Sequence, residues 1–196
     1  MKTTFLIWMS FFLFLGCAEK NMENLPLQSD EGFFNALIEI PAGTNKKYEY
    51  NSESLTFEID QRDGQDRIIS YLPYFANYGY IPSTVSDASK GGDGDPLDIF
   101  VITESLPQST LIAVIPVGAV KLIDNGEEDF KIIAVPADDE LNLLKVNDFS
   151  GFKARHPSVM RIIEIWLSHY DSDPITIEGW LDEKQTKKYI MENRRK

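Results

Sequence analysis

The residues with the clearest chemical meaning are three aspartates in one short turn. Asp93, Asp95 and Asp98 lie in the segment GGDGDPLDIFV, residues 91–101, where glycine and proline give way to an apolar run. Three carboxylates this close repel one another, and the repulsion is costly unless a cation neutralises it. A site made of oxygen ligands alone suits hard ions such as Mg²⁺, Mn²⁺ or Ca²⁺. The spacing therefore predicts a divalent-cation site.

Two other interpretations of this segment have to be weighed. An EF-hand loop that starts at Asp93 would correctly have Glu104 at its twelfth position. However, Leu97 would stand at the fifth position, which needs a ligand, and Asp98 at the sixth, which needs glycine. The residues after Asp98 also have the apolar pattern of a strand. The other alternative, aspartates that simply face water in a polar turn, stays open because turns favour Asp and Gly.

A second acidic cluster lies in residues 121–131, KLIDNGEEDFK. Asp124 and Asp129 flank an Asn-Gly pair, which favours a β-hairpin. Lys131 follows Asp129 by two residues, so both side chains lie on the same strand face. A carboxylate beside an ammonium group suits a metal–phosphate complex. Taken alone, the pattern is equally typical of a hairpin tip that is acidic for solubility.

Three further segments upstream carry polar groups in apolar surroundings. Glu39 lies between two isoleucines, so we expect it to face water or to have a cationic partner, because an unpaired buried carboxylate is costly. Lys47 and Glu49 share one strand face, for which an ordinary cross-strand ion pair is the simpler interpretation. The aromatic run from Tyr74 to Tyr80 is typical of a core, although its tyrosines also offer hydroxyl donors.

Five segments taken in order resemble the soluble family I inorganic pyrophosphatases. They are IEIP with KYE, then NYGYIP, DGDPLD, D-(x)4-D-x-K and HY, and the resemblance extends from about residue 38 to residue 180. It implies a closed five-stranded barrel of OB-like shape whose mouth binds pyrophosphate together with several Mg²⁺ ions, Mn²⁺ being an alternative ion. The activity that it implies is hydrolysis of pyrophosphate to two phosphates by metal-activated water (EC 3.6.1.1).

The resemblance also assigns roles to individual residues. Asp95 matches the catalytic aspartate that accepts a proton from the attacking water. Metal-binding carboxylates correspond to Asp93, Asp95, Asp98, Asp124, Asp129, Glu39 and Glu49. Phosphate-contacting groups correspond to Lys47, Arg67, Tyr78, Lys131 and Tyr170, and Tyr74 matches a hydroxyl near the site. Arg62 is the alternative to Arg67, because the loop length differs here.

The chain departs from the family pattern at two positions. Asn125 stands where glutamate is usual, and Asp171 stands where the family has a phosphate-binding lysine. The second change replaces a cation by an anion, which puts phosphate affinity in question unless Lys153, Arg155 or another residue substitutes. The three central aspartates are retained, so we expect activity to survive with altered KM or metal preference.

The remaining pattern predicts an α+β fold, namely a small closed five-stranded OB-like β-barrel with peripheral helices in one domain, residues 33–196. Strands are predicted at 36–41, 47–50, 55–59, 97–102, 111–117, 130–135 and 175–180. Helices are predicted at 139–147, at 157–170 and from about residue 182. The helix at 157–170 is the clearest, because Val159, Ile162, Ile163, Trp166, Leu167 and Tyr170 form an apolar stripe.

The N-terminus is expected to lie outside this domain. Its apolar run, residues 5–15, is too short to span a bilayer but suits the core of a signal peptide, residues 1–16. The run ends at Cys17, the single cysteine of the chain, and resembles a bacterial lipoprotein signal in which this cysteine is lipidated. Residues 17–32 would then be a tether. An ordinary signal peptide, or an uncleaved anchor with an incidental cysteine, is the alternative.

Location and partners follow from these features and from charge. A lipidated Cys17 implies the bacterial cell envelope, periplasmic or surface-facing rather than cytoplasmic, with contact to the membrane through the lipid only. With 19 Lys and Arg against 31 Asp and Glu, the net charge is −12, which argues against nucleic acid as a partner. Bacterial members of the family form homohexamers, so a homo-oligomer is expected. A hydrolase of polyphosphate or nucleotides, and a module that binds ions or phosphate without turnover, stay as alternative functions.

Overall fold

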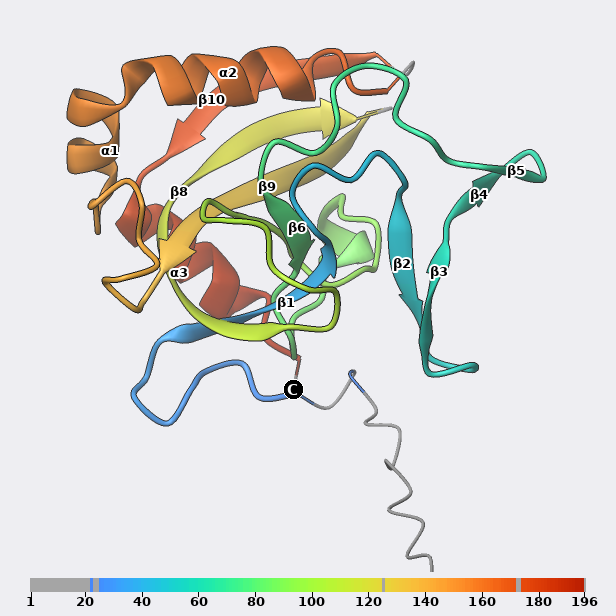
Figure 1. The fold of residues 1–196 in the computed structure, drawn as a ribbon, viewed down its shortest axis with the longest axis horizontal. Helices are drawn as coiled ribbons and strands as arrows, with labels where there is room; N and C mark the ends of the chain where they lie inside the picture. Colours follow the sequence, from blue (N-terminus) through green and yellow to red (C-terminus); the bar gives the residue numbers. More distant parts are fainter. Residues whose placement is uncertain (1–21, 23–24, 125, 172–173, 196) are drawn as a thin grey trace, which may run out of the picture.

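A ring of five β-strands forms the centre of the molecule (Figure 1). The computed structural model describes residues 22, 25–124, 126–171 and 174–195. The ring follows the order β1-β6-β7-β9-β8 and closes because β1 also pairs with β8. Its strands are β1 (Phe34–Ile40), β6 (Asn77–Tyr80), β7 (Asp98–Val101), β9 (Glu127–Pro136) and β8 (Leu111–Asp124). The predicted closed five-stranded barrel is therefore confirmed, and β10 (Ile175–Leu181) extends it by pairing with β8.

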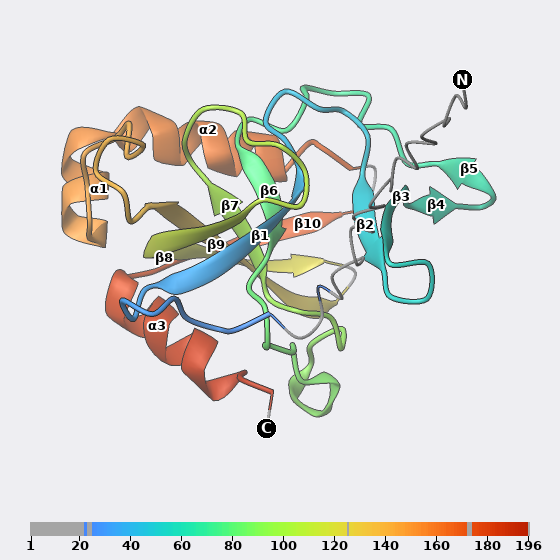
Figure 2. The same ribbon diagram turned by 60° about the horizontal axis from the view of Figure 1, so that its bottom comes forward.

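Peripheral elements surround this barrel. Two small hairpins project together on one side of it (Figures 1 and 2), and three helices pack elsewhere against the sheet. The hairpins are β2 (Tyr48–Asn51) with β3 (Thr56–Ile59), and β4 (Gln61–Arg62) with β5 (Gln65–Asp66). The helices are α1 (Phe149–Arg155), α2 (Pro157–Leu167) and α3 (Glu183–Glu192), together with the short 3₁₀ turn η2 (Ala88–Lys90). Within the described residues, no helix has the length and apolarity needed to cross a membrane.

Aromatic side chains join α2 to the barrel. The Trp166 ring lies 5.1 Å from that of Tyr74, and Tyr78 lies 4.9 Å from Phe100, measured between ring centroids. The Trp166 indole also donates hydrogen bonds to the carbonyls of Leu72 and Pro73, at 3.0 and 3.1 Å. The aromatic run is thus core, as the sequence indicates, and it fixes the position of the C-terminal end of α2.

The predicted stripe on α2 is only partly correct. Ile163, Trp166 and Leu167 are buried, but Ile162 is 53% exposed. The helix ends at Leu167, three residues earlier than predicted, so Tyr170 lies in the turn beyond it. The helix presents a narrower face to the barrel than the sequence pattern suggests.

The helix predicted at 139–147 is wrong, because this segment consists of turns. The buried Asn142 side chain organises them: its amide donates to the carbonyl of Val146 at 3.0 Å, and its oxygen accepts from the N–H of Lys145 at 2.9 Å. A helix, α1, follows instead, capped by the Asp148 carboxylate, which accepts from the N–H of Gly151 at 2.6 Å. A Ser-Gly pair in α1 weakens its helical signal, which is why the sequence did not reveal it.

Part of the predicted tether packs against the barrel. Leu25 and Leu27 are buried, and the backbone N–H of Asn35 donates to the Leu27 carbonyl at 2.9 Å. The Ser83 hydroxyl donates to the carbonyl of Leu25 at 2.8 Å. Residues 25–32 therefore lie on the domain although their sequence is polar and aperiodic. The predicted signal peptide, residues 1–16, and Cys17 lie outside the described residues.

Candidate active site

A cavity of about 400 Å³ opens at one end of the barrel, beside the two hairpins and α2. The structure brings to it every residue that the sequence nominates for metal, substrate or proton transfer. These are Glu39, Lys47, Glu49, Arg67, Tyr74, Tyr78, Asp93, Asp95, Asp98, Asp124, Asp129, Lys131 and Tyr170. Arg62, the alternative arginine, also lines the cavity, whereas Lys153 and Arg155 do not. Of the possible replacement cations named above, Lys153 and Arg155 therefore lie away from the cavity lining.

Hydrogen bonds to backbone groups hold the aspartate turn in place. Asp93 accepts from the N–H of Asp95 at 2.9 Å. The backbone of Ser86 pairs with this turn twice, donating to the Asp95 carbonyl at 2.7 Å and accepting from the Gly94 N–H at 2.9 Å. Gly94 has a φ of 90°, which a glycine adopts without strain. Strand β7 then begins at Asp98, so the segment is a tight turn entering a strand and not an EF-hand loop.

Negative charge accumulates at this turn. Burial raises the pKa of Asp95, and the charges of Asp93, Glu49 and Asp98 raise it further. The part of this shift that comes from Asp93, Glu49 and Asp98 is repulsion between ionised carboxylates, which a bound cation would relieve. Among the described residues, no three acidic, histidine or cysteine side chains are arranged to enclose an ion directly. The carboxylate oxygens of the turn are nevertheless ligands of the type that Mg²⁺ accepts.

Lys131 lies beside these aspartates because β7 and β9 run parallel, with Ile99 opposite Ile132. Its side chain is buried, it forms an ion pair with Asp98, and its Nζ lies 2.7 Å from Asp129 Oδ1. Burial alone would lower the pKa of Lys131, but Asp129 and Asp98 raise it well above its ordinary value. The cavity thus holds a permanently charged ammonium group.

Glu39 meets neither of the two expectations stated for it. It is only 7% exposed, and its carboxylate accepts from the backbone N–H of Tyr50 at 2.9 Å. Burial raises the pKa of Glu39 to about 8, with further increases from Asp98 and Glu49 that the Tyr50 hydrogen bond and Lys47 only partly offset. A buried carboxylate with this pKa is held mainly in its neutral form at pH 7 when no cation is bound.

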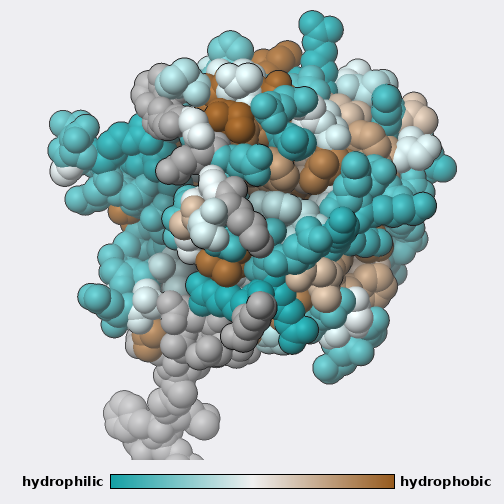
Figure 3. Space-filling model, turned by 180° about the vertical axis from the view of Figure 1, so that it is seen from behind, coloured by the Kyte–Doolittle hydropathy of each residue, from teal (hydrophilic) through white to brown (hydrophobic). Residues whose placement is uncertain are grey.

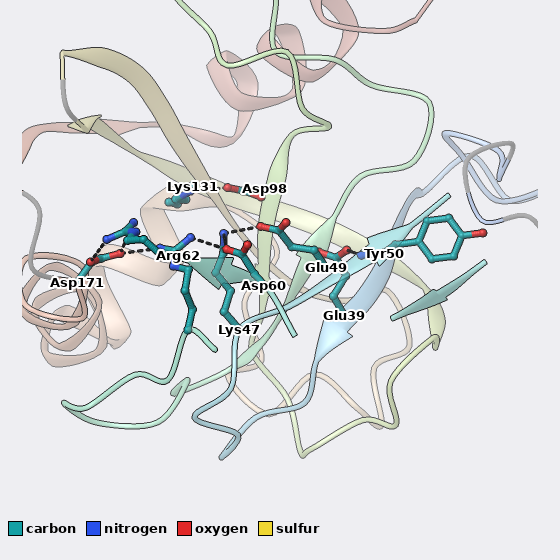
Figure 4. Close-up of polar contacts among 10 residues, drawn as sticks. Glu39, Lys47, Glu49, Tyr50, Asp60, Arg62, Asp98, Lys131 and Asp171 are labelled. Carbon is teal, nitrogen blue, oxygen red and sulfur yellow. Dashed lines mark hydrogen bonds and ion pairs between the residues drawn. The ribbon is translucent and has the colours of Figure 1, made fainter. Parts of the chain in front are cut away.

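A chain of ion pairs runs beside the cavity (Figure 4), and its members Lys47, Glu49 and Arg67 line the cavity. Lys47 Nζ lies 2.5 Å from Glu49 Oε1 and 3.1 Å from Asp60 Oδ2. Arg67 continues the chain, with Nη1 at 2.7 Å from Asp60 Oδ2 and Nη2 at 2.6 Å from Asp171 Oδ2. The sequence did not reveal Asp60, because it is 13 residues from Lys47 and belongs to no motif. Cations and anions alternate along this chain of ion pairs.

Tyrosine hydroxyls complete the cavity. Tyr74 and Tyr78 are buried, and the ring of Tyr170 stacks on Trp166 with 4.6 Å between centroids. Burial raises the pKa of Tyr170 to about 12, and it raises the pKa of Tyr78 well above the ordinary value. Both hydroxyls therefore stay protonated near neutral pH and can donate hydrogen bonds to an anion.

Comparison with known proteins identifies this arrangement. Residues 36–196 match the family model described as inorganic pyrophosphatase. The chain belongs to the inorganic pyrophosphatase family. Among curated relatives, the inorganic pyrophosphatase of Neisseria meningitidis serogroup B is 33% identical over 181 residues, which are 90% of this chain and 95% of the relative. The inorganic pyrophosphatase of Synechocystis is also 33% identical, over 83% of this chain and 90% of the relative.

Solved structures give the same result. The inorganic pyrophosphatase of Thermus thermophilus superposes with a TM-score of 0.76 at 25% identity, over 89% of this chain and 97% of that one. The type I inorganic pyrophosphatase of Toxoplasma gondii superposes with a TM-score of 0.79 at 27% identity, over 88% of this chain and 84% of that one. The chain is thus a family I inorganic pyrophosphatase, an enzyme of the class that hydrolyses inorganic pyrophosphate.

The raised pKa of Glu39 predicts how stability depends on pH in metal-free buffer. The folded state holds the proton more tightly than the unfolded state does, so the free energy of unfolding falls as pH rises from about 4.5 to about 8. Glu39→Gln removes this titration and keeps an acceptor for the Tyr50 N–H. The melting temperature of the variant minus that of the wild type should therefore be several degrees larger at pH 8.5 than at pH 5. For a domain of this size, 1 kcal/mol of stability corresponds to about 2–4 °C in melting temperature.

Scanning calorimetry with EDTA present measures this difference. A gap between the two melting temperatures that stays the same at both pH values would contradict the account of Glu39.

Proposed function

We propose that the chain hydrolyses pyrophosphate by metal-activated water, with the residues of the cavity in the roles given below. The observation that supports this most strongly is the meeting of the Asp93–Asp98 turn and several fixed cations in one cavity. Carboxylates at the turn can hold divalent ions, and Lys131, Lys47 and Arg67 can bind phosphate oxygens. Pyrophosphate is densely anionic, so an acidic protein binds it through such cations.

Mg²⁺ is the ion that we propose for the site, held by Asp93, Asp95 and Asp98 with further carboxylates around them. The outer carboxylates are Glu39, Glu49, Asp124 and Asp129. When bound, the metal lowers the pKa of water and neutralises charge on the phosphates, and Mn²⁺ is an alternative ion.

The protein residues orient the substrate and move the proton. Asp95 accepts the proton of the attacking water, a role that a carboxylate positioned beside the water can fill. Lys131 holds a non-bridging oxygen, and Arg67 can bind two oxygens at once through its planar group. Tyr78 and Tyr170 donate hydrogen bonds, with the Tyr74 hydroxyl nearby. Phosphoryl transfer requires mainly this positioning and neutralisation, and no covalent intermediate.

We further propose that the enzyme forms homo-oligomers through an apolar surface on α2. Figure 3 shows that the face seen from behind is mostly polar, with separate hydrophobic patches. Several large apolar side chains are exposed on or beside α2, namely Ile162, Ile165, Tyr71 and Leu72. The 71–72 segment adjoins α2, because the Tyr71 ring stacks on His169 with 5.7 Å between centroids. Exposed apolar groups gathered in one place are typical of an interaction surface.

The third part of the proposal concerns location. A lipid on Cys17 would hold the enzyme at the bacterial cell envelope, on the periplasmic or the outer surface. The support is the apolar run that ends at the single cysteine of the chain. The residues after Leu25 pack on the domain, so a tether would consist of the residues between Cys17 and Leu25.

Replacing the proposed base tests the proposed reaction. Asp95→Asn should lower kcat for Mg²⁺-dependent phosphate release from pyrophosphate by roughly 10²–10⁴-fold, the usual contribution of a positioned proton acceptor. Asp139→Asn is the matched control, because Asp139 is exposed and outside the cavity. Full activity of Asp95→Asn would exclude the proposed role. Faster turnover of tripolyphosphate or ATP than of pyrophosphate by the wild type would instead favour the alternative substrates.

Charged substitutions on α2 test the oligomer. Ile162→Glu together with Ile165→Glu should shift the protein to monomers in sedimentation velocity, because burying two carboxylates in an apolar contact is costly. Met191→Glu, an equally exposed apolar position on α3, is the control and should leave the association state unchanged. An oligomer that persists in the double variant would show that another surface carries the contact.

Expression of the full chain in a bacterium tests the lipid. The wild type should partition into the detergent phase of Triton X-114 and incorporate labelled palmitate, whereas Cys17→Ser should do neither. Both proteins should hydrolyse pyrophosphate equally, since Cys17 precedes the domain. Absence of label on the wild type would refute the lipid anchor and leave an ordinary signal peptide or uncleaved anchor.

A further inference from the structure

Arg195 is a cation of the cavity to which the sequence assigns no role. Among the described residues, five cationic side chains line the cavity, namely Lys47, Arg62, Arg67, Lys131 and Arg195. The first four form ion pairs with carboxylates. Arg195 is exposed, and its guanidinium group forms no hydrogen bond or ion pair with any other residue in the part of the chain that the structure describes. No contact with a carboxylate therefore offsets its positive charge.

Backbone hydrogen bonds hold the segment of Arg195 close to the aspartate turn. Residues 193–195, which follow α3, are joined to residues 83–85 by two backbone hydrogen bonds of 2.8 and 2.9 Å. The next residue, Ser86, donates its N–H to the Asp95 carbonyl at 2.7 Å. A single stretch of backbone thus connects the segment of Arg195 to the turn that carries the central aspartates.

Ser83, at this junction, is held from two sides. Its φ is 57°, in the left-handed region that residues other than glycine rarely adopt. Its carbonyl accepts from the Arg195 N–H at 2.9 Å, and its hydroxyl donates to the Leu25 carbonyl at 2.8 Å. Ser83 also lines the cavity. A strained backbone that neighbouring contacts hold in place is typical of functional sites, and here it fixes where the backbone of Arg195 lies.

Only one of two adjacent arginines is directed to the cavity. Arg194 pairs with Thr84 as in an antiparallel sheet, and it does not line the cavity, whereas Arg195 does. Consecutive side chains of an extended segment point to opposite sides. The pairing with Thr84 therefore accounts for the different placement of the two side chains.

Arg195 reaches the cavity from a different side than Arg62 and Arg67. In Figures 1 and 2 the red segment that follows α3 lies at the lower edge of the molecule, apart from the hairpin β4–β5. Arg62 belongs to that hairpin, and Arg67 directly follows it. A phosphate held by Arg67 would lie toward the hairpin, so Arg195 is placed to meet a different phosphate group.

We propose that Arg195 binds a second phosphate group at the edge of the cavity, apart from the position served by Arg67. This phosphate can come from two sources: the phosphate released by hydrolysis, and the outer phosphate of a chain longer than pyrophosphate, such as tripolyphosphate. A guanidinium group binds either one through paired N–H donors. The inference rests on the proposed function, because it extends the same cavity by one anion.

Inhibition of pyrophosphate hydrolysis tests the proposal and separates the two sources. With Mg²⁺ present, Arg195→Ala should raise the inhibition constant of tripolyphosphate, of inorganic phosphate or of both by roughly five- to tenfold, the effect of losing one charged hydrogen bond at a solvated site. A rise for tripolyphosphate alone assigns the position to a longer chain, and a rise for inorganic phosphate alone assigns it to the released product. Alanine keeps the backbone N–H that bonds to Ser83, so the fold should be retained.

Arg194→Ala is the matched control, because it removes the same charge from the adjacent exposed residue outside the cavity. It should leave both inhibition constants unchanged. Arg195→Lys keeps the charge without the planar fork and should give intermediate values. Calorimetric titration with tripolyphosphate and Mg²⁺ measures binding without turnover and should show the same loss of affinity in Arg195→Ala. Circular dichroism verifies that each variant is folded.

Three results would overturn the proposal. Unchanged inhibition constants in Arg195→Ala would mean that Arg195 contacts no phosphate. An equal rise in Arg194→Ala would mean that the effect is general attraction by surface charge. A change confined to the KM for pyrophosphate would mean that Arg195 contacts the substrate and no second group. A wild type that fails to hydrolyse pyrophosphate would contradict the proposed function, whereas the calorimetric comparison would still test Arg195, so the two failures are distinct.

Discussion

Repulsion between carboxylates is the constraint on which the site depends. Asp93, Asp95 and Asp98 are held in one short turn. Glu49 raises the pKa of Asp95, and Asp98 and Glu49 raise the pKa of Glu39. Cations favour the ionised form of such a group. Lys131 supplies one positive charge, and in the proposed function divalent ions supply further compensation. The same repulsion would then give the site affinity for a metal and, through the metal, for a phosphate anion.

The strand pairing of the barrel fixes where these charged groups lie. The parallel pairing of β7 with β9 sets Lys131 beside Asp98, and the alternation along β9 turns Asp129 to the same face. The cations Lys47, Arg62 and Arg67 are positioned differently, by ion pairs with Glu49, Asp60 and Asp171. The carboxylates thus lie on a short turn and on barrel strands, whereas the positions of these cations depend on side-chain contacts.

The parts of the molecule that were predictable from sequence are those with local signals. A few consecutive residues are enough to predict the DGDPLD turn, the strands around it and the helix beginning at Pro157. The segment 139–147 was misassigned because its structure depends on the buried side chain of one residue, Asn142. Arg62 and Asp171 are 109 positions apart in the sequence, so no local sequence pattern predicts their contact. The identity of Asp171 showed a departure from the family pattern, but only the fold shows what the residue contacts.

The most direct test of the central claim is a crystal structure of the enzyme with Mn²⁺ and a non-hydrolysable pyrophosphate analogue, with anomalous scattering used to locate the metal. The account predicts Mn²⁺ peaks within coordination distance of Asp93, Asp95 and Asp98, and analogue phosphates in contact with Lys131 and Arg67. Metal peaks only at surface carboxylates outside the cavity, or an analogue bound without contact to these cations, would contradict it.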